Sequence, residues 1–199
     1  MLNIENKCEY LTEPDFLNFI FAPLFETQKA ALAVSGGPDS MALLHLAALF
    51  AKGQEQEIEL TVLTVDHGLR AAAADEAKMV EQAAKALGLD CHVLRPTDFD
   101  PQSRIQQSAR EMRYQLMQQK MQELGLSQLF TAHHLDDQAE TFFMRLARGS
   151  GLTGLGAMGR NSVGFGLDIV RPLLDLPKSD LVDFAQIEGI QYVQDPSNN

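Results

Sequence analysis

One six-residue segment, SGGPDS at positions 35–40, constrains the fold of this chain more than any other. It follows an apolar run at 30–34 that predicts a short buried β-strand, and it precedes a helix-forming run at 41–49. A strand, a glycine-rich turn and a helix in this order bind anions. Glycine lets the backbone approach the anion, and the helix N-terminus attracts negative charge. The segment therefore predicts a phosphate-binding loop.

The carboxylate of Asp39 would repel a bare phosphate, so its place in this loop favours a magnesium nucleotide. The loop lacks the lysine of the G-x-x-x-x-G-K-[ST] motif and is a different kind of loop. An ordinary strand–helix turn with glycine at its tight positions is the alternative interpretation. The predicted nucleotide contacts in the loop are Ser35, Gly36, Gly37, Pro38, Asp39 and Ser40.

The composition is that of a globular chain, with 199 residues, 45% hydrophobic and 22% charged. No apolar run reaches the roughly 20 residues that a membrane-spanning helix needs. The two cysteines, Cys8 and Cys91, are far apart and form no metal or redox motif, which fits a reducing cytoplasm. A net charge of −11 opposes general attraction to nucleic acid. Arginines nevertheless gather in the second half of the chain, so a local basic face is compatible with this charge.

Strand-like and helix-like runs alternate along the chain, which predicts right-handed βαβ units and a parallel sheet. Strands are expected at 30–34, 58–65, 91–94 and 128–132, with a further extended segment at 169–174. Helices are expected at 14–25, 39–51, 73–87, 103–124 and 136–148, with one more opening at Pro177. Ligands bind at the carboxyl ends of such strands. We therefore expect segments 35–40, 66–70 and 133–140 to converge.

A second concentration of chemistry lies at 133–141, where two histidines precede acidic residues. Asp137 and Glu140 would lie one turn apart on a helix and could hold magnesium or a substrate ammonium group. Carboxylates that complement the helix dipole are the alternative. A zinc site is weakly supported, because an oxygen-rich cluster near phosphates favours magnesium. His133 and Asp136 belong to the same candidate substrate site.

Arg110 and Arg113 share a helix face at 103–124 and suit a phosphate or a carboxylate. An ordinary amphipathic helix with Ala109, Met112, Leu116 and Met121 in its core stripe is also compatible with this pattern. At the end of the second strand, Asp66 and His67 are candidate nucleotide contacts, although His67 could instead hold the loop.

Taken together, these segments resemble one family of PP-loop ATP pyrophosphatases, the tRNA(Ile)-lysidine synthetases. The matching motifs, in order, are SGGPDS, VDHGLR, AREMRY, AHHLDDQAET, RGSGLTGL, RPLL and DPSNN. The resemblance implies a Rossmann-like adenine nucleotide alpha hydrolase fold, with a parallel five-stranded sheet and helices on both faces. It also implies one catalytic domain, with a nucleotide-binding core at 26–155 and an extension at 156–199. The carboxyl-terminal tRNA-binding domains of the family are expected to be absent.

The implied reaction uses ATP to adenylate the first anticodon cytidine of a tRNA(Ile) with the anticodon CAU. Free lysine then attacks carbon 2 and expels AMP, which gives lysidine. In this scheme Asp39, Arg113, Asp137 and Glu140 are catalytic, and Asp39 and Asp137 hold Mg²⁺. Substrate contacts are assigned to Arg110, Arg113, His133, Asp136, Asp137, Glu140 and Arg148. The family also suggests a homodimer.

Three other functions stay open from the sequence. A tRNA-thiolating enzyme of the same superfamily typically carries Cys-x-x-Cys pairs, which this chain lacks. A GMP or NAD synthetase fits the loop but not the later motifs. A module that binds ATP without turning it over is the third.

Overall fold

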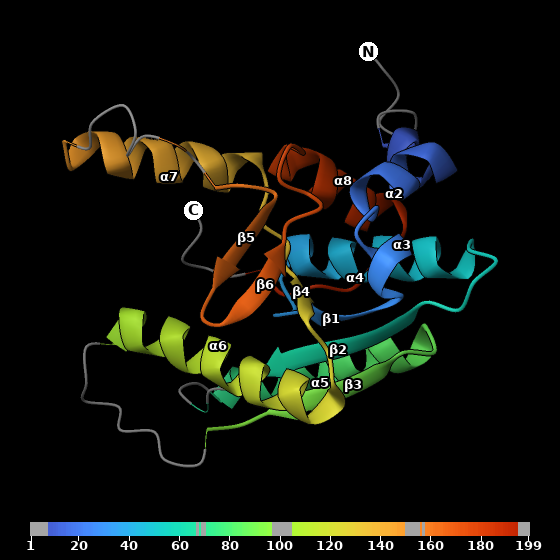
Figure 1. Cartoon of the computed structure of the whole chain (residues 1–199), viewed down its shortest axis with the longest axis horizontal. Coiled ribbons are helices and arrows are strands. Elements are labelled where there is room, and N and C mark those ends of the chain that lie inside the picture. Colours follow the sequence, from blue (N-terminus) through green and yellow to red (C-terminus); the bar gives the residue numbers. More distant parts are fainter. Residues whose placement is uncertain are drawn as a thin grey trace.

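The computed structural model describes residues 8–66, 68, 71–96, 105–149, 156 and 158–194 (Figure 1). A 3-10 turn, η1 (Glu9–Thr12), and two short helices, α2 (Pro14–Ile20) and α3 (Leu24–Thr27), lead into the first strand. The remaining elements, in chain order, are β1 (Lys29–Ala33), α4 (Pro38–Lys52), β2 (Glu59–Val65), α5 (Ala71–Ala86), β3 (Asp90–Leu94), α6 (Ile105–Leu124), β4 (Gln128–Phe130), α7 (Leu135–Ala147), β5 (Asn161–Gly164), β6 (Leu167–Val170) and α8 (Lys178–Ile187).

The strands form one six-stranded sheet in the order β3-β2-β1-β4-β6-β5. The first five strands in that order pair in parallel, which confirms the predicted parallel arrangement. The edge strand β5 pairs antiparallel with β6 and was not predicted. Its four residues end in glycine, and Val163 is 80% exposed, so it shows no apolar periodicity.

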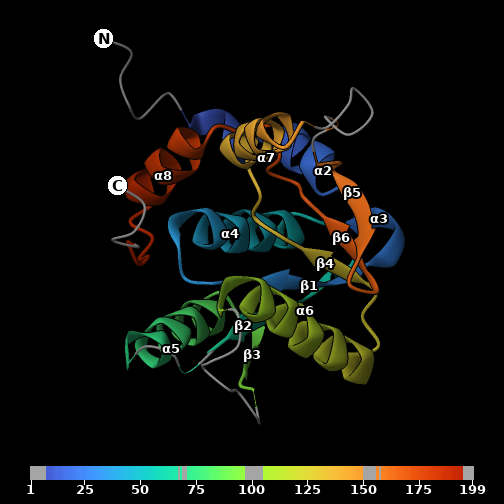
Figure 2. The same cartoon turned by 90° about the vertical axis from the view of Figure 1, so that its left-hand side faces the viewer.

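Helices cover both faces of the sheet, as expected; Figure 2 shows α4 and α6 on opposite sides of it. On one face, α4 packs against alternate residues of β1, including Ala30 and Leu32, with further contributions from α5 and α8. On the other face, Ala31 belongs to a second cluster with α6. Residues 156–194 therefore contribute β5, β6 and α8 to the same sheet and core as the first 149 residues.

Two details of the helices differ from expectation. The predicted helix at 14–25 is divided into α2 and α3, with Pro23 just before α3 begins. Among the described side chains of α6, Tyr114, Met117 and Met121 are buried, whereas Met112 and Leu116 are only partly buried. The predicted core stripe is therefore confirmed at Met121 and wrong at Met112 and Leu116, since Tyr114 and Met117 take the buried positions instead.

The chain reverses its direction of progress across the sheet between β1 and β4. In open α/β sheets this switch point creates the ligand-binding crevice at the carboxyl edge. The ends of α6 and α7 lie on either side of this edge in Figure 2. Among the described helices, none is both long enough and apolar enough to cross a membrane.

Candidate active site at the carboxyl edge of the sheet

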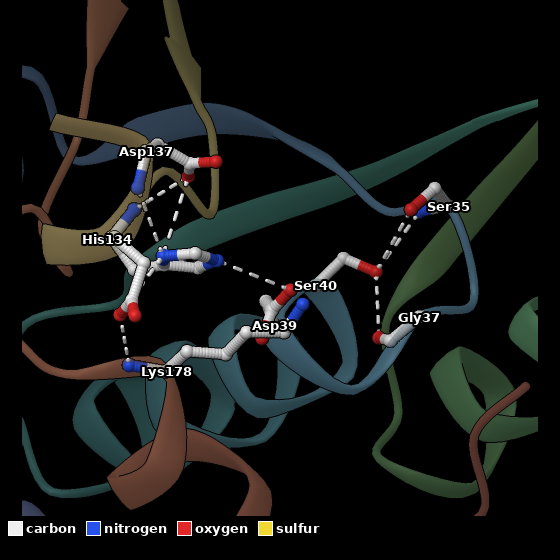
Figure 3. A network of polar contacts seen from close by, with 8 residues as sticks. Ser35, Gly37, Asp39, Ser40, His134, Asp137 and Lys178 are labelled. Atoms are coloured by element: carbon white, nitrogen blue, oxygen red, sulfur yellow. Dashed lines mark hydrogen bonds and ion pairs between the residues drawn. The ribbon is translucent and has the colours of Figure 1, made fainter. Parts of the chain in front are cut away.

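The loop between β1 and α4 is organised by the hydroxyl of Ser40 (Figure 3). This oxygen accepts a hydrogen bond from the backbone N–H of Ser35 at 3.1 Å and donates one to the carbonyl of Gly37 at 3.0 Å. Gly37 is the N-cap of α4, and Pro38 occupies its first turn. The loop therefore wraps around the N-terminus of a 15-residue helix, where an anion is favoured.

Glycine is required at position 36, where φ is +90°. A β-carbon there would lie 3.3 Å from the terminal methyl of Met79 and 3.6 Å from Val80, both on α5. The carbonyl of Gly36 accepts a hydrogen bond from Val193 at 2.9 Å. The loop is thus fixed from two sides, by α5 and by the segment after α8.

His134 links this loop to the start of α7 (Figure 3). Its Nε2 lies 3.5 Å from Oδ2 of Asp39, and its Nδ1 lies 3.5 Å from Oδ2 of Asp137. The same residue caps α7: its side chain accepts from the Asp137 N–H, and Asp137 accepts from the His134 N–H at 2.9 Å. The expected convergence of segments 35–40 and 133–140 is therefore confirmed. It occurs through a histidine that sequence reasoning did not place in the site.

The two neighbouring histidines have opposite protonation tendencies. Burial lowers the pKa of His133 to about 4, and the charge of Arg171 acts in the same direction. Burial also acts to lower the pKa of His134, but contact with Asp39 and the charges of Asp137 and Asp136 outweigh it and raise that pKa. His133 is thus a neutral group whose Nδ1 lies 2.8 Å from the Thr131 hydroxyl, while the pKa of His134 lies above its ordinary value.

Asp39 offers an oxygen for a cation. Its Oδ1 is buried and has no hydrogen-bond partner in the described structure. This oxygen is therefore available to a metal ion or to a hydrogen-bond donor. The described residues contain no group of three or more histidine, cysteine or acidic side chains arranged to hold a metal. The His134 ring lies between Asp39 and Asp137 and contacts both carboxylates, so metal binding by this pair stays a prediction.

The carboxylates on α7 are held to different degrees. Asp136 accepts from the backbone N–H of Lys178 at 2.8 Å, which ties α7 to the start of α8. Asp137 forms the capping pair, so the helix-end interpretation accounts for part of its role. Glu140 is exposed and forms no hydrogen bond or ion pair with another described residue. Asp136 and Glu140 line one open hollow with Ala139, Phe143 and Met144.

The predicted residues that lie elsewhere can be placed as follows. Asp66 is buried at the end of β2, where it accepts from the Gly68 N–H and from Arg95. His67 lies outside the described residues. Arg148 is the exposed C-cap of α7, about 20 Å along the helix from His134, and is not brought to the loop.

The predicted arginines of α6 lie near a third arginine that had not been assigned to the site. Arg110 is exposed and its guanidinium lies 5.3 Å from the centre of the Tyr114 ring, and Arg113 is partly buried. Arg171, directly after β6, is 7% exposed. Its position at the carboxyl end of a strand could have indicated a place in the site. The sequence pattern was interpreted only as the RPLL motif, of which Arg171 is the first residue.

This arrangement defines an α/β nucleotide-binding domain: a glycine-containing loop at a helix N-terminus, at the switch point of a mostly parallel sheet. Comparison with known families gives the particular class. Residues 4–199 match the PP-loop domain, and the chain belongs to that family.

Among curated proteins, the chain is similar to the tRNA(Ile)-lysidine synthases of Bradyrhizobium diazoefficiens and Rhodopseudomonas palustris. It is 47% identical to the first, over 90% of this chain and 50% of that protein. It is 48% identical to the second, over 88% of this chain and 52% of that protein. The chain thus spans about half the length of these relatives.

Solved structures show the same fold at low sequence identity. A U34-tRNA thiolase from Methanococcus maripaludis has a TM-score of 0.72 at 18% identity, over 91% of this chain and 66% of that one. An NAD⁺ synthetase from Burkholderia pseudomallei has a TM-score of 0.55 at 14% identity, over 98% and 70%. These likenesses confirm the adenine nucleotide alpha hydrolase type of fold.

Proposed function

We propose that this chain is the catalytic domain of a tRNA(Ile)-lysidine synthetase. It would ligate lysine to carbon 2 of the first anticodon cytidine of a tRNA(Ile) with the anticodon CAU, in the cytoplasm. The observation that carries the proposal is the contact of Asp39 with His134, which joins the phosphate loop to the acidic start of α7. Relatives of that name match the chain over most of its length.

In the first step, the tRNA cytidine attacks the α-phosphate of ATP and pyrophosphate leaves. The loop at 35–40 and the N-terminus of α4 would hold the leaving pyrophosphate. Asp39 would hold Mg²⁺ through its unpartnered Oδ1, with the remaining ligands from nucleotide phosphates and water. When bound, Mg²⁺ would offset the charge that develops on the phosphate oxygens. His134 would keep the Asp39 carboxylate in place.

In the second step, the lysine amine attacks carbon 2 and AMP leaves. The hollow on α7 has the chemistry that lysine needs: Asp136 and Glu140 can pair with an ammonium group. Ala139, Phe143 and Met144 can cover the methylene chain. We assign lysine binding to this hollow, with Asp137 helping through its position at the helix cap.

Features of the cysteines weigh against the thiolation alternative. Neither Cys8 nor Cys91 forms a disulfide; Cys8 is buried, and burial raises the pKa of Cys91 to about 11. A thiol with a raised pKa is a poor nucleophile at neutral pH. A homodimer remains an expectation from the family resemblance, and sedimentation velocity would test it.

The test is ATP-dependent transfer of labelled lysine onto an unmodified tRNA with the anticodon CAU. The chain is assayed beside the full-length relative from Bradyrhizobium diazoefficiens, with a tRNA of anticodon GAU as the negative substrate. Transfer by the chain, or AMP release that depends on the CAU tRNA, supports the proposal. ATP binding with neither reaction, while the relative is active, would contradict it for this chain.

A further inference from the structure

Two arginines, Arg110 and Arg171, lie near the neutral His133 beside the proposed active site, and Arg113 lies one helical turn from Arg110 on α6. Arg110 and Arg171 are both close enough to His133 for their charges to lower its pKa. Arg110 also lowers the pKa of Arg113 and of Arg171, after the larger effect of burial. We call Arg110, Arg113, Arg171 and His133 the arginine cluster. It is contributed by α6 and by the carboxyl ends of β4 and β6.

The cluster carries positive charge that the described chain does not neutralise. None of its three guanidinium groups forms an ion pair with a described residue, although the chain as a whole has a net charge of −11. Arg171 is 7% exposed, and its Nε is buried with no hydrogen-bond partner in the described structure. Like charges placed together at partly buried positions are costly unless an anion completes them.

Neighbouring groups hold Arg171 and Arg110 in place without neutralising their charge. One terminal nitrogen of Arg171 donates to the carbonyl of Gly159 at 2.9 Å and to the hydroxyl of Ser162 at 2.8 Å. Arg110 lies over the ring of Tyr114, which in turn stacks on Phe165 with ring centres 4.3 Å apart. A guanidinium held by its flat face keeps its N–H edges free for an oxyanion.

We propose that the arginine cluster binds the phosphodiester backbone of the RNA substrate where it enters the site. This inference rests on the proposed function, since it assumes that the substrate is a tRNA anticodon loop. An RNA backbone carries one negative charge on each nucleotide and can pair with several arginines. The single carboxylate of an amino acid pairs with one guanidinium group. Pyrophosphate already has a place at the N-terminus of α4, and the ammonium group of lysine has one in the hollow on α7.

The position of the cluster agrees with this assignment. His133 immediately precedes His134, which contacts Asp39 of the phosphate loop, so the cluster adjoins the nucleotide site. In Figure 2, α6 borders the same edge of the sheet toward which the N-terminus of α4 points. RNA held along α6 would therefore present its cytidine toward the phosphate loop.

The experiment measures binding of a 17-nucleotide RNA hairpin with a CAU loop to Arg113→Gln and Arg110→Gln at several salt concentrations. Lys120→Gln is the matched control: it removes one charge from the same helix, where Lys120 pairs with Glu123. We expect each arginine variant to weaken RNA binding about tenfold and to reduce the slope of log K against log salt by about 0.7–0.9. The control should change affinity by less than about twofold.

Lysine binding, measured by equilibrium dialysis with ATP present, separates the two sources of an oxyanion. Weaker lysine binding with unchanged RNA affinity and salt slope would assign the cluster to a carboxylate and overturn the proposal. Absence of hairpin binding by the wild-type chain at 50 mM salt would also overturn it. Arg171→Lys, checked by thermal unfolding, tests the buried fork: it should weaken RNA binding while keeping the charge.

The outcomes also separate this inference from the proposed function. If the arginine variants weaken RNA binding but the wild-type chain transfers no lysine, the RNA surface stands and the lysidine reaction does not. If lysine transfer occurs and the variants bind RNA as the wild type does, the lysidine reaction stands and the RNA-binding role of the arginine cluster does not.

Discussion

Nε2 of His134 lies 3.5 Å from Oδ2 of Asp39, although the two residues belong to elements far apart in the sequence. One imidazole thereby contacts the phosphate loop through one nitrogen and caps α7 through the other. These two roles can be separated by substitution, because asparagine is a good helix N-cap but is too short to replace both nitrogens.

We predict that His134→Ala loses about 1 kcal/mol of unfolding free energy, the usual cost of a lost N-cap, while His134→Asn keeps most of it. Both variants should lower ATP-dependent AMP formation by about ten- to a hundredfold, because Asp39 loses its positioning contact. Chemical denaturation and a steady-state AMP assay measure the two effects. An asparagine variant with full activity would show that the contact with Asp39 has no catalytic role.

We predict that Gly36→Ala is more harmful than Gly88→Ala. Both glycines have positive φ, +90° and +77°, so both substitutions carry a backbone penalty of about 1–2 kcal/mol. Only at position 36 does the new β-carbon also meet side chains of α5, with the nearest atom at 3.3 Å. Gly36→Ala should therefore have the lower melting temperature and bind ATP more weakly, as isothermal titration calorimetry would show. Equal losses in the two variants would contradict the packing argument.

The pKa values of His133 and His134 should lie on opposite sides of the ordinary histidine value, which is near 6.5. In NMR titrations of the imidazole signals, His133 should titrate near pH 4 and His134 above its ordinary value. The raised pKa of His134 contributes stability that is complete below about pH 6.5 and is lost as pH rises through the folded-state pKa. The lowered pKa of His133 destabilises the fold as pH falls from about 6.5 toward 4. Reversed titration order would contradict the assignment.

Ser40→Ala should weaken ATP binding more than it weakens the fold. The hydroxyl is buried, accepts from Ser35 and donates to Gly37, so its removal leaves one loop N–H and one loop carbonyl without their partner. We expect a loss of about 1–2 kcal/mol in unfolding free energy and a KM for ATP that rises by about tenfold or more. Thr12→Ala, which also removes a side-chain hydroxyl bond but far from the loop and from the arginine cluster, is the control. Unchanged KM would show that the loop is organised by its backbone alone.

Local patterns were sufficient to predict most of the fold. The strands β1 to β4 and the helices between them follow from apolar runs and from glycines that end helices, such as Gly88 and Gly125. The edge strand β5 could not be predicted, because it is short and exposed and depends on pairing with β6.

The candidate site was predictable only in part. The phosphate loop is a continuous motif between a predicted strand and a predicted helix, so its residues could be proposed from the local sequence together with the family resemblance. The contact between His134 and Asp39, and the approach of Arg171 to Arg110, depend on long-range strand order. No local pattern distinguishes His133 from His134, and it is the contact with Asp39 that shows His134 to face the loop.

The central place of β1 in the sheet has a consequence for synthesis of the chain. β2 pairs with one side of β1, and β3 lies beyond β2. The other side of β1 pairs with β4, which is synthesised much later. A nascent chain that ends before β4 would expose an unpaired strand edge, a surface prone to aggregation. Its phosphate loop would be complete in sequence but would lack His134. Ordering of the nucleotide site is therefore expected to be a late event in folding, tied to the docking of β4 beside β1.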